Sequence, residues 1–288
     1  MFPRADLPAV RSAAPPMGSG ASRRRASRRL GGGMKASDLL VRCLEAEGVE
    51  HVFGVPGEET LDLNESLDRS SIRFVPVRHE QGAAYMADAY GRLTGRAGVC
   101  LATLGPGATN LVTGVADAFL DRAPLVALTG QADLERLHKE SHQSVDVLGI
   151  LRPVTKWNAR VSDPAIVPEV IRKAFKVAET DEPGPTHVEL PEDVMRAEAD
   201  GEPLPRRAAP RPEPTAQDLS RAVALIVEAE RPVILAGNGV ARARAAGALR
   251  AFSRSTGIPV AVTFMGKGVV DDDDPLALGA VGLQAGDY

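Results

Sequence analysis

Short β-rich runs alternate with segments of helical periodicity from Met34 onward, and this alternation most constrains the fold of the chain. Helical patterns separate four expected strands, which cover residues 51–55, 72–77, 99–103 and 125–129. Because strands that alternate with helices usually pair in parallel, the pattern predicts an α/β fold with a mostly parallel sheet covered on both faces. Ligands of such sheets bind beyond the carboxyl ends of the strands. The segments that follow these strands are therefore the candidates for a functional site.

Composition divides the chain into four expected parts. Residues 1–33 contain seven Arg, no Lys and one acid, without hydrophobic periodicity, so we expect a disordered basic extension. Residues 34–200 form the first α/β domain, and the proline-rich segment 201–215 is an extended linker. A second α/β unit at 216–288 has expected strands at 233–236 and 258–263. Since about seventy residues make a thin α/β domain, this unit is expected to be incomplete.

Charge and hydropathy exclude two classes of partner. The net charge is −4, and because residues 1–33 carry +6, the remainder carries −10, which argues against nucleic-acid binding. The apolar stretch 97–116 is long enough to span a bilayer, but five glycines or prolines interrupt it, so we expect no membrane partner. The two cysteines, Cys43 and Cys100, are expected to be buried free thiols.

Two interpretations of residues 1–33 remain. Their Arg-, Ser- and Ala-rich composition fits an organelle transit peptide. The alternative is a start assigned too early, and this is favoured because Met34 to Asp38 lead directly into the first expected helix. The second interpretation predicts a cytoplasmic protein, and the first predicts an organelle.

Glu80 is the most informative single residue, because it stands at the corner between the strand 72–77 and a helical stretch at 81–90. A helix N-terminus favours the charged form of a carboxylate, while apolar surroundings favour the neutral acid. A carboxyl group under both influences can exchange protons near neutral pH. On the residue alone, a capping role at the start of the helix is the alternative.

Glycines and amides follow the next two strands. Gly105-Pro106-Gly107 can bring bare backbone against a flat ring, because glycine has no Cβ; the alternative is a tight turn. Asn110 is expected in the first turn of a helix, where a polar role is common. Gln131 follows a buried strand, so its amide must find partners, and a satisfied residue at the strand end is its alternative.

A series of segments in this order resembles the thiamine-diphosphate enzymes of the acetolactate synthase (acetohydroxyacid synthase) family. The resemblance runs from Met34 to Tyr288 and implies a parallel-sheet pyrimidine-binding domain followed by a truncated Rossmann-like central domain. The segments are Phe53-Gly54-Val55-Pro56-Gly57-Glu58, Arg78-His79-Glu80-Gln81-Gly82-Ala83-Ala84, Gly105-Pro106-Gly107-Ala108-Thr109-Asn110, Asp121-Arg122-Ala123-Pro124-Leu125-Val126, Gly130-Gln131, His142-Gln143-Ser144, Thr155-Lys156-Trp157 and Pro183-Gly184-Pro185.

The resemblance assigns roles to residues of this chain. Glu80 is implied as the catalytic proton relay to N1′ of the thiamine aminopyrimidine, and Gln131 as a second catalytic residue beside the reacting carbon. Residues implied to hold the pyrimidine are Pro56, Gly57, Glu80, Gly105, Pro106, Gly107 and Asn110; those implied on the substrate side are His142, Gln143 and Lys156. Leu104 stands where many members have Ser, which puts one side-chain contact in doubt.

The resemblance also implies cofactors that this chain does not hold by itself. In the family, a C-terminal domain with a Gly-Asp-Gly motif binds Mg²⁺ and the diphosphate, and no Gly-Asp-Gly occurs here. We therefore assign no metal ligand to the chain. FAD is left open, although His142 argues against it, because flavin-binding biosynthetic members usually carry Phe at that position.

The implied activity is the condensation of two pyruvates to 2-acetolactate with loss of CO₂, in a homodimer or tetramer whose site lies between subunits. This chain is expected to be inactive alone, and a biosynthetic role in branched-chain amino acids or a catabolic role is left open. Glu80 argues against glyoxylate carboligase, a relative with Val at that position. The alternatives are another thiamine-dependent 2-keto acid decarboxylase, or a non-catalytic α/β module that binds a ligand or partner.

Overall fold

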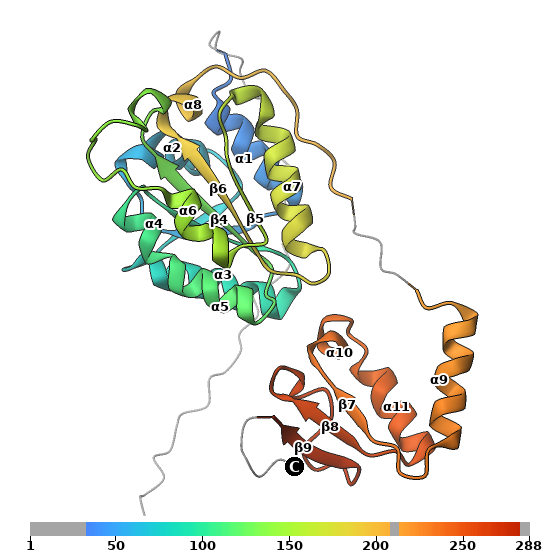
Figure 1. Cartoon of the computed structure of the whole chain (residues 1–288). Coiled ribbons are helices and arrows are strands. Elements are labelled where there is room, and N and C mark those ends of the chain that lie inside the picture. Colours follow the sequence, from blue (N-terminus) through green and yellow to red (C-terminus); the bar gives the residue numbers. More distant parts are fainter. Residues whose placement is uncertain (1–32, 208–212, 283–288) are drawn as a thin grey trace, which may run out of the picture. The chain divides into compact units, whose positions relative to one another are not determined.

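The computed structural model describes residues 33–207 and 213–282, which contain a six-stranded and a three-stranded parallel sheet (Figure 1). The expected basic extension lies outside the described residues except for Gly33. Residues 201–207 and 213–215, from the expected linker, form neither helix nor strand.

All six strands of the first sheet run parallel, in the order β2-β1-β3-β4-β6-β5. The α/β fold with a parallel sheet is therefore confirmed. The four predicted strands agree with the structure within two residues, whereas β5 and β6 were not predicted. In chain order, the strands are β1 (His51–Gly54), β2 (Arg73–Pro76), β3 (Gly98–Ala102), β4 (Leu125–Gln131), β5 (Trp157–Arg160) and β6 (Pro185–Pro191).

Helices cover both faces of this sheet, because its central strands are apolar on both sides. In β3, Val99 and Leu101 face one hydrophobic core, while Cys100 and Ala102 face the other. The first core includes α1 (Ala36–Glu47), α2 (Leu61–Asp68), α7 (Val167–Glu179) and α8 (Glu192–Arg196). The second core includes α3 (Glu80–Thr94), α4 (Pro106–Asn110), α5 (Val112–Leu120) and α6 (Val147–Leu151).

The parallel arrangement brings the candidate segments to one edge. The strands β1, β2, β3 and β4 end at Gly54, Pro76, Ala102 and Gln131. Because the carboxyl ends of parallel strands meet at the same edge, the loops that follow them lie there together. This edge therefore carries the Pro56-Gly57 loop, Glu80 and the Gly105–Gly107 turn.

The apolar stretch 97–116 folds as strand β3, a glycine turn, helix α4 and the start of α5, as its glycines predicted. Of the helices that the structure describes, none is long and apolar enough to cross a membrane. Cys43 and Cys100 are buried free thiols, and burial raises the pKa of each to about 12.

The second sheet has three parallel strands in the order β7-β8-β9, and it has its own small core around Ala236, Val260 and Val262. The elements of this unit are α9 (Ala216–Glu228), β7 (Ile234–Ala236), α10 (Asn238–Arg242), α11 (Ala246–Thr256), β8 (Val260–Thr263) and β9 (Ala277–Val281). The alternation of helix and strand predicted for this part of the chain is therefore present.

Candidate active site

Glu80 is the first residue of α3, four residues after the end of β2, and its side chain is half-buried. The helix start is capped by His79, whose Nδ1 accepts a hydrogen bond of 3.2 Å from the backbone N–H of Gln81. Because His79 caps the helix, the Glu80 carboxylate does not act as the N-cap. It is directed instead toward the turn after β3.

Asn110 is the direct partner of Glu80: its side-chain Nδ2 donates a hydrogen bond of 2.9 Å to Glu80 Oε2. Asn110 is the last residue of α4, a helix of about one turn that begins at Pro106. Among the described residues, no group donates a hydrogen bond to the other oxygen, Glu80 Oε1. Oε2 is therefore held by Asn110, and Oε1 is available to bond a ligand.

The glycine turn after β3 lies against this available oxygen. A Cβ added to Gly107 would lie 3.5 Å from Glu80 Oε1 and 2.8 Å from Thr103 Cγ2. Gly105 has φ +54° and ψ −119°, and a Cβ there would overlap the backbone oxygen of Gln143. Side chains are therefore excluded from both glycine positions, and the turn presents backbone beside Glu80.

The Pro56-Gly57 loop lies at the neighbouring strand end, since β1 and β3 are paired. Gly57 sits so close to the Thr103 side chain that no Cβ would fit. The Thr103 hydroxyl in turn donates a hydrogen bond of 2.7 Å to Glu59 Oε2. Pro56 itself is exposed. These contacts fix the loop after β1 against the residue that begins the loop after β3.

His142 and Gln143 lie in the β4–α6 loop, residues 132–146, and both are exposed. Gln143 has φ +57°, and its backbone oxygen packs on Gly105. The structure therefore brings this loop to the glycine turn beside Glu80.

Gln131 is the last residue of β4 and is almost fully buried. Its Nε2 donates to Glu189 Oε1 at 2.9 Å and to Val145 O at 3.4 Å, and its Oε1 accepts from Ala132 N at 2.9 Å. The amide is thus occupied by protein partners and not directed at Glu80. The geometry matches the alternative interpretation of Gln131, a satisfied residue at the strand end.

Lys156 is not brought to the site. It precedes β5 and so lies at the amino edge of the sheet, opposite Glu80. Its Nζ donates to Val177 O at 2.5 Å and Thr180 O at 2.9 Å, at the end of α7, and burial lowers its pKa. The structure therefore does not bring Lys156 to the surface that carries His142 and Gln143, because a parallel sheet separates a strand's start from its end.

The main residues that were missed in the sequence are Glu189 and Arg160. Glu189 lies on β6 with no exposed surface, and its Oε2 accepts a hydrogen bond from Arg160 Nε. The sequence did offer a signal for Glu189. It lies two residues from His187 in a strand that is buried on both faces, and a buried charge is rare without a partner, so its presence there indicates a partner such as Arg160.

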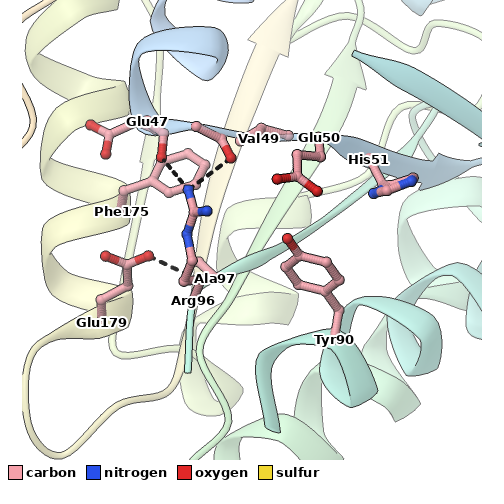
Figure 2. A pocket seen from close by; sticks show the side chains of 10 residues that line it. Glu47, Val49, Glu50, His51, Tyr90, Arg96, Ala97, Phe175 and Glu179 are labelled. Atoms are coloured by element: carbon pink, nitrogen blue, oxygen red, sulfur yellow. Dashed lines mark hydrogen bonds between the residues drawn. The ribbon is translucent and has the colours of Figure 1, made fainter. Parts of the chain in front are cut away.

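A shallow depression lies at the amino edge of the sheet, away from Glu80, and Figure 2 shows its side chains. The Arg96 guanidinium donates to the backbone oxygens of Glu47 and Gly48 at 3.1 and 2.8 Å, while Glu179 accepts from Ala97 N at 3.1 Å. Arg96 thus satisfies carbonyls at the end of α1, a structural role. In the part of the chain that the structure describes, no group of three or more His, Cys, Asp or Glu residues is placed to hold a metal ion.

Comparison with known families matches two parts of the chain. Residues 34–150 match the N-terminal TPP-binding domain of thiamine pyrophosphate enzymes, and residues 219–288 match the central domain of the same enzymes. The chain belongs to the thiamine pyrophosphate enzyme family. Thiamine pyrophosphate is the same compound as thiamine diphosphate, so the family predicted from the sequence is confirmed.

Relatives of this chain are named acetolactate synthase or glyoxylate carboligase. The chain is 43% identical over 257 residues to a probable acetolactate synthase large subunit of Methanocaldococcus jannaschii. This alignment covers 87% of this chain and 44% of the relative. It is 44% identical over 255 residues to the acetolactate synthase large subunit of Corynebacterium glutamicum, covering 87% and 41%. It is also 41% identical over 255 residues to a glyoxylate carboligase of Escherichia coli O157:H7, covering 87% and 43%. The chain therefore spans less than half the length of each of these relatives.

Proposed function

We propose that this chain supplies the pyrimidine-facing part of a thiamine-diphosphate-dependent carboligase that condenses two pyruvates to 2-acetolactate with loss of CO₂. The observation that carries the proposal is the half-buried Glu80 carboxylate, with one oxygen held by Asn110 and the other beside Gly107, a position without a side chain.

The residues at this edge fit a flat aminopyrimidine. Glu80 Oε1 is within reach of a ring nitrogen placed over the Gly105–Gly107 turn, since no Cβ fills that space. Asn110 fixes the carboxylate so that it does not have to be ordered when the ring binds, which lowers the entropic cost of binding. We assign the pyrimidine to Glu80, Asn110, the glycine turn and the Pro56-Gly57 loop.

When bound, thiamine diphosphate supplies an electron sink for the loss of CO₂ from a 2-keto acid. The task of Glu80 is to share a proton with the pyrimidine nitrogen N1′ through Oε1. Its half-buried position keeps bulk water from competing fully for that oxygen, which strengthens the hydrogen bond. Asn110, which donates to Oε2, keeps the orientation of the carboxylate through the transfer.

The substrate side is assigned to His142 and Gln143, which are exposed in the β4–α6 loop next to the glycine turn. Lys156 lies at the opposite edge of the sheet and is left out of this assignment, and we assign to Gln131, whose amide bonds that loop, a role in positioning it. Mg²⁺ and the diphosphate are assigned to no residue of this chain. We propose that they are supplied by a C-terminal domain of a longer polypeptide that contains this chain, called here the complete polypeptide. A second copy of it would supply that domain, in a homodimer or tetramer with the site between subunits.

The similarity to a glyoxylate carboligase supports a second candidate, a carboligase or decarboxylase of the same family that takes a different 2-keto acid. Glu80 argues against glyoxylate carboligase itself, which the resemblance gives a Val at that position, but it does not separate the other members of this candidate from the acetolactate reaction. The two candidates differ in substrate, so product analysis separates them.

The experiment assays this chain, and the proposed complete polypeptide, with thiamine diphosphate and Mg²⁺. Pyruvate, glyoxylate and 2-ketobutyrate are supplied in turn, and products are identified by mass spectrometry. We expect 2-acetolactate from pyruvate with the complete polypeptide, and none from this chain alone. A product formed only from glyoxylate supports the second candidate, and the absence of any product and of cofactor binding rejects both. The absorbance of the purified protein near 450 nm reports bound FAD.

A further inference from the structure

An ion pair with a fully buried carboxylate joins the neighbouring strands β5 and β6. Arg160 Nε donates to Glu189 Oε2, and the Arg160 side chain is 27% exposed while that of Glu189 has no exposed surface. Burying a carboxylate costs free energy unless all of its acceptor capacity is used. The second oxygen, Glu189 Oε1, accepts a hydrogen bond of 2.9 Å from the side chain of Gln131. Gln131 lies on β4, the neighbour of β6 on the side away from β5 (Figure 1).

Gln131 in turn contacts both ends of the β4–α6 loop. Its Oε1 accepts from the backbone N–H of Ala132, the first residue of the loop. Its Nε2 also donates to the backbone oxygen of Val145, one residue before the N-cap of α6. One side chain, oriented by Glu189, therefore closes a fifteen-residue loop at its base.

The same loop reaches the glycine turn near its C-terminal end, two residues before Val145. The backbone oxygen of Gln143 packs on Gly105, where no Cβ would fit, and Gln143 has positive φ. Because the loop is held at its base and again at Gln143, the exposed side chains of His142 and Gln143 are presented at the carboxyl edge of the sheet.

We propose that Arg160 and Glu189 form a positioning pair that acts through Gln131 to hold the β4–α6 loop against the Gly105–Gly107 turn. The pair touches neither cofactor nor substrate. Its consequence for substrate binding rests on the proposed function, whereas its effect on the loop does not.

The first test measures the order of the loop by limited trypsin digestion of the folded chain. Arg136 and Lys139 lie in the loop and are exposed, so mass spectrometry of cleavage after them reports loop opening. Gln131→Met keeps side-chain length but removes the bonds to both loop ends, and Arg160→Gln removes the charge at the rim of the pair. We expect cleavage at these two positions to become about tenfold faster in Gln131→Met and severalfold faster in Arg160→Gln.

Thr129→Val is the matched control. Thr129 lies on β4 two residues from Gln131, is fully buried and bonds to His187 Nε2 at 2.8 Å, but it contacts neither end of the loop. This variant should lower the melting temperature without changing loop cleavage. Arg160→Lys, which keeps a cation, should restore slow cleavage. Unchanged cleavage in Gln131→Met and Arg160→Gln, or an equal rise in Thr129→Val, would overturn the proposal.

The second test uses the complete polypeptide. Loosening the loop in Arg160→Gln should raise KM for the 2-keto acid about tenfold and leave the half-saturating concentration of thiamine diphosphate unchanged. An equal rise in KM and in the half-saturating concentration of thiamine diphosphate contradicts a positioning role, and so does no change in either. If the wild-type polypeptide has no carboligase activity, the proposed function fails, and the digestion result still decides whether the pair holds the loop.

Discussion

The side-chain amide of Asn110 donates a hydrogen bond of 2.9 Å to the Glu80 carboxylate, which joins the end of α4 to the start of α3. These helices follow β3 and β2, two strands separated in the sheet by β1. The bond therefore connects residues from two different βα units. It leaves Glu80 Oε1 as the oxygen that faces the glycine turn.

Asn110→Ala should weaken thiamine diphosphate binding by the complete polypeptide about five- to tenfold, because Glu80 loses the donor that orients it. Calorimetric titration with the cofactor measures the effect. Thr109→Ala is the control: this neighbour on α4 is exposed, and its hydroxyl donates to the backbone oxygen of Pro106 and not to Glu80. Equal affinity in wild type and Asn110→Ala would contradict a role of Asn110 in the site.

Gly105→Ala should destabilise the chain by about 2–4 kcal/mol, because the new Cβ combines positive-φ strain with overlap on the Gln143 backbone. Gly95→Ala provides the comparison, since Gly95 also has positive φ (+71°) but has open space around its Cβ position. That variant should lose only about 1 kcal/mol. Denaturant unfolding gives both values, and equal losses would show that the loop does not press on the turn.

Lys156→Met should lower stability by about 1–2 kcal/mol, because the carbonyls of Val177 and Thr180 lose their donor at the end of α7. The same variant of the complete polypeptide should keep the wild-type KM for its 2-keto acid. A large rise in KM with unchanged stability would instead restore Lys156 to the substrate side.

His187 predicts a pH dependence of stability. Burial lowers the pKa of His187 from 6.5 to about 3, so the folded chain keeps it neutral where the unfolded chain protonates it. The unfolded state then binds more protons, and the stability present above pH 6.5 is lost as the pH falls toward 3.

Between pH 6.5 and 5, His187 should contribute a slope of up to about 1.4 kcal/mol per pH unit in the free energy of unfolding. His187→Gln, which can still bond Thr129, should flatten that slope. His138→Gln, in the exposed part of the β4–α6 loop, should not. Urea unfolding at several pH values makes the measurement, and parallel profiles for wild type and His187→Gln would contradict it.

The residues that were well predicted are those whose position follows from the strand ends. Apolar runs located β1 to β4, and parallel pairing then placed Gly57, Glu80 and Gly105 at one edge without further information. The family resemblance supplied the expected roles of these residues, and their roles remain proposals. No pattern in the sequence by itself indicated that Asn110 bonds Glu80.

The failures have a common physical reason. Lys156 stands before a strand that was not predicted, so its place at the amino edge could not be deduced. Gln131 and Glu189 are partners because β4 and β6 are adjacent, a pairing between residues 58 positions apart that local periodicity does not encode. The pairing of strands that are far apart in the sequence decides which buried polar groups form hydrogen bonds with each other.

The most direct test of the central claim is the rate of deuterium exchange at C2 of thiamine diphosphate bound to the complete polypeptide with Glu80→Gln. The amide keeps the shape of Glu80 but cannot share the proton. Glu169→Gln, at an exposed residue in the first turn of α7, is the control. If Glu80 is the proton relay, exchange should slow by at least about 100-fold in Glu80→Gln and stay unchanged in Glu169→Gln. Wild-type exchange in Glu80→Gln, with the cofactor bound, would contradict the account.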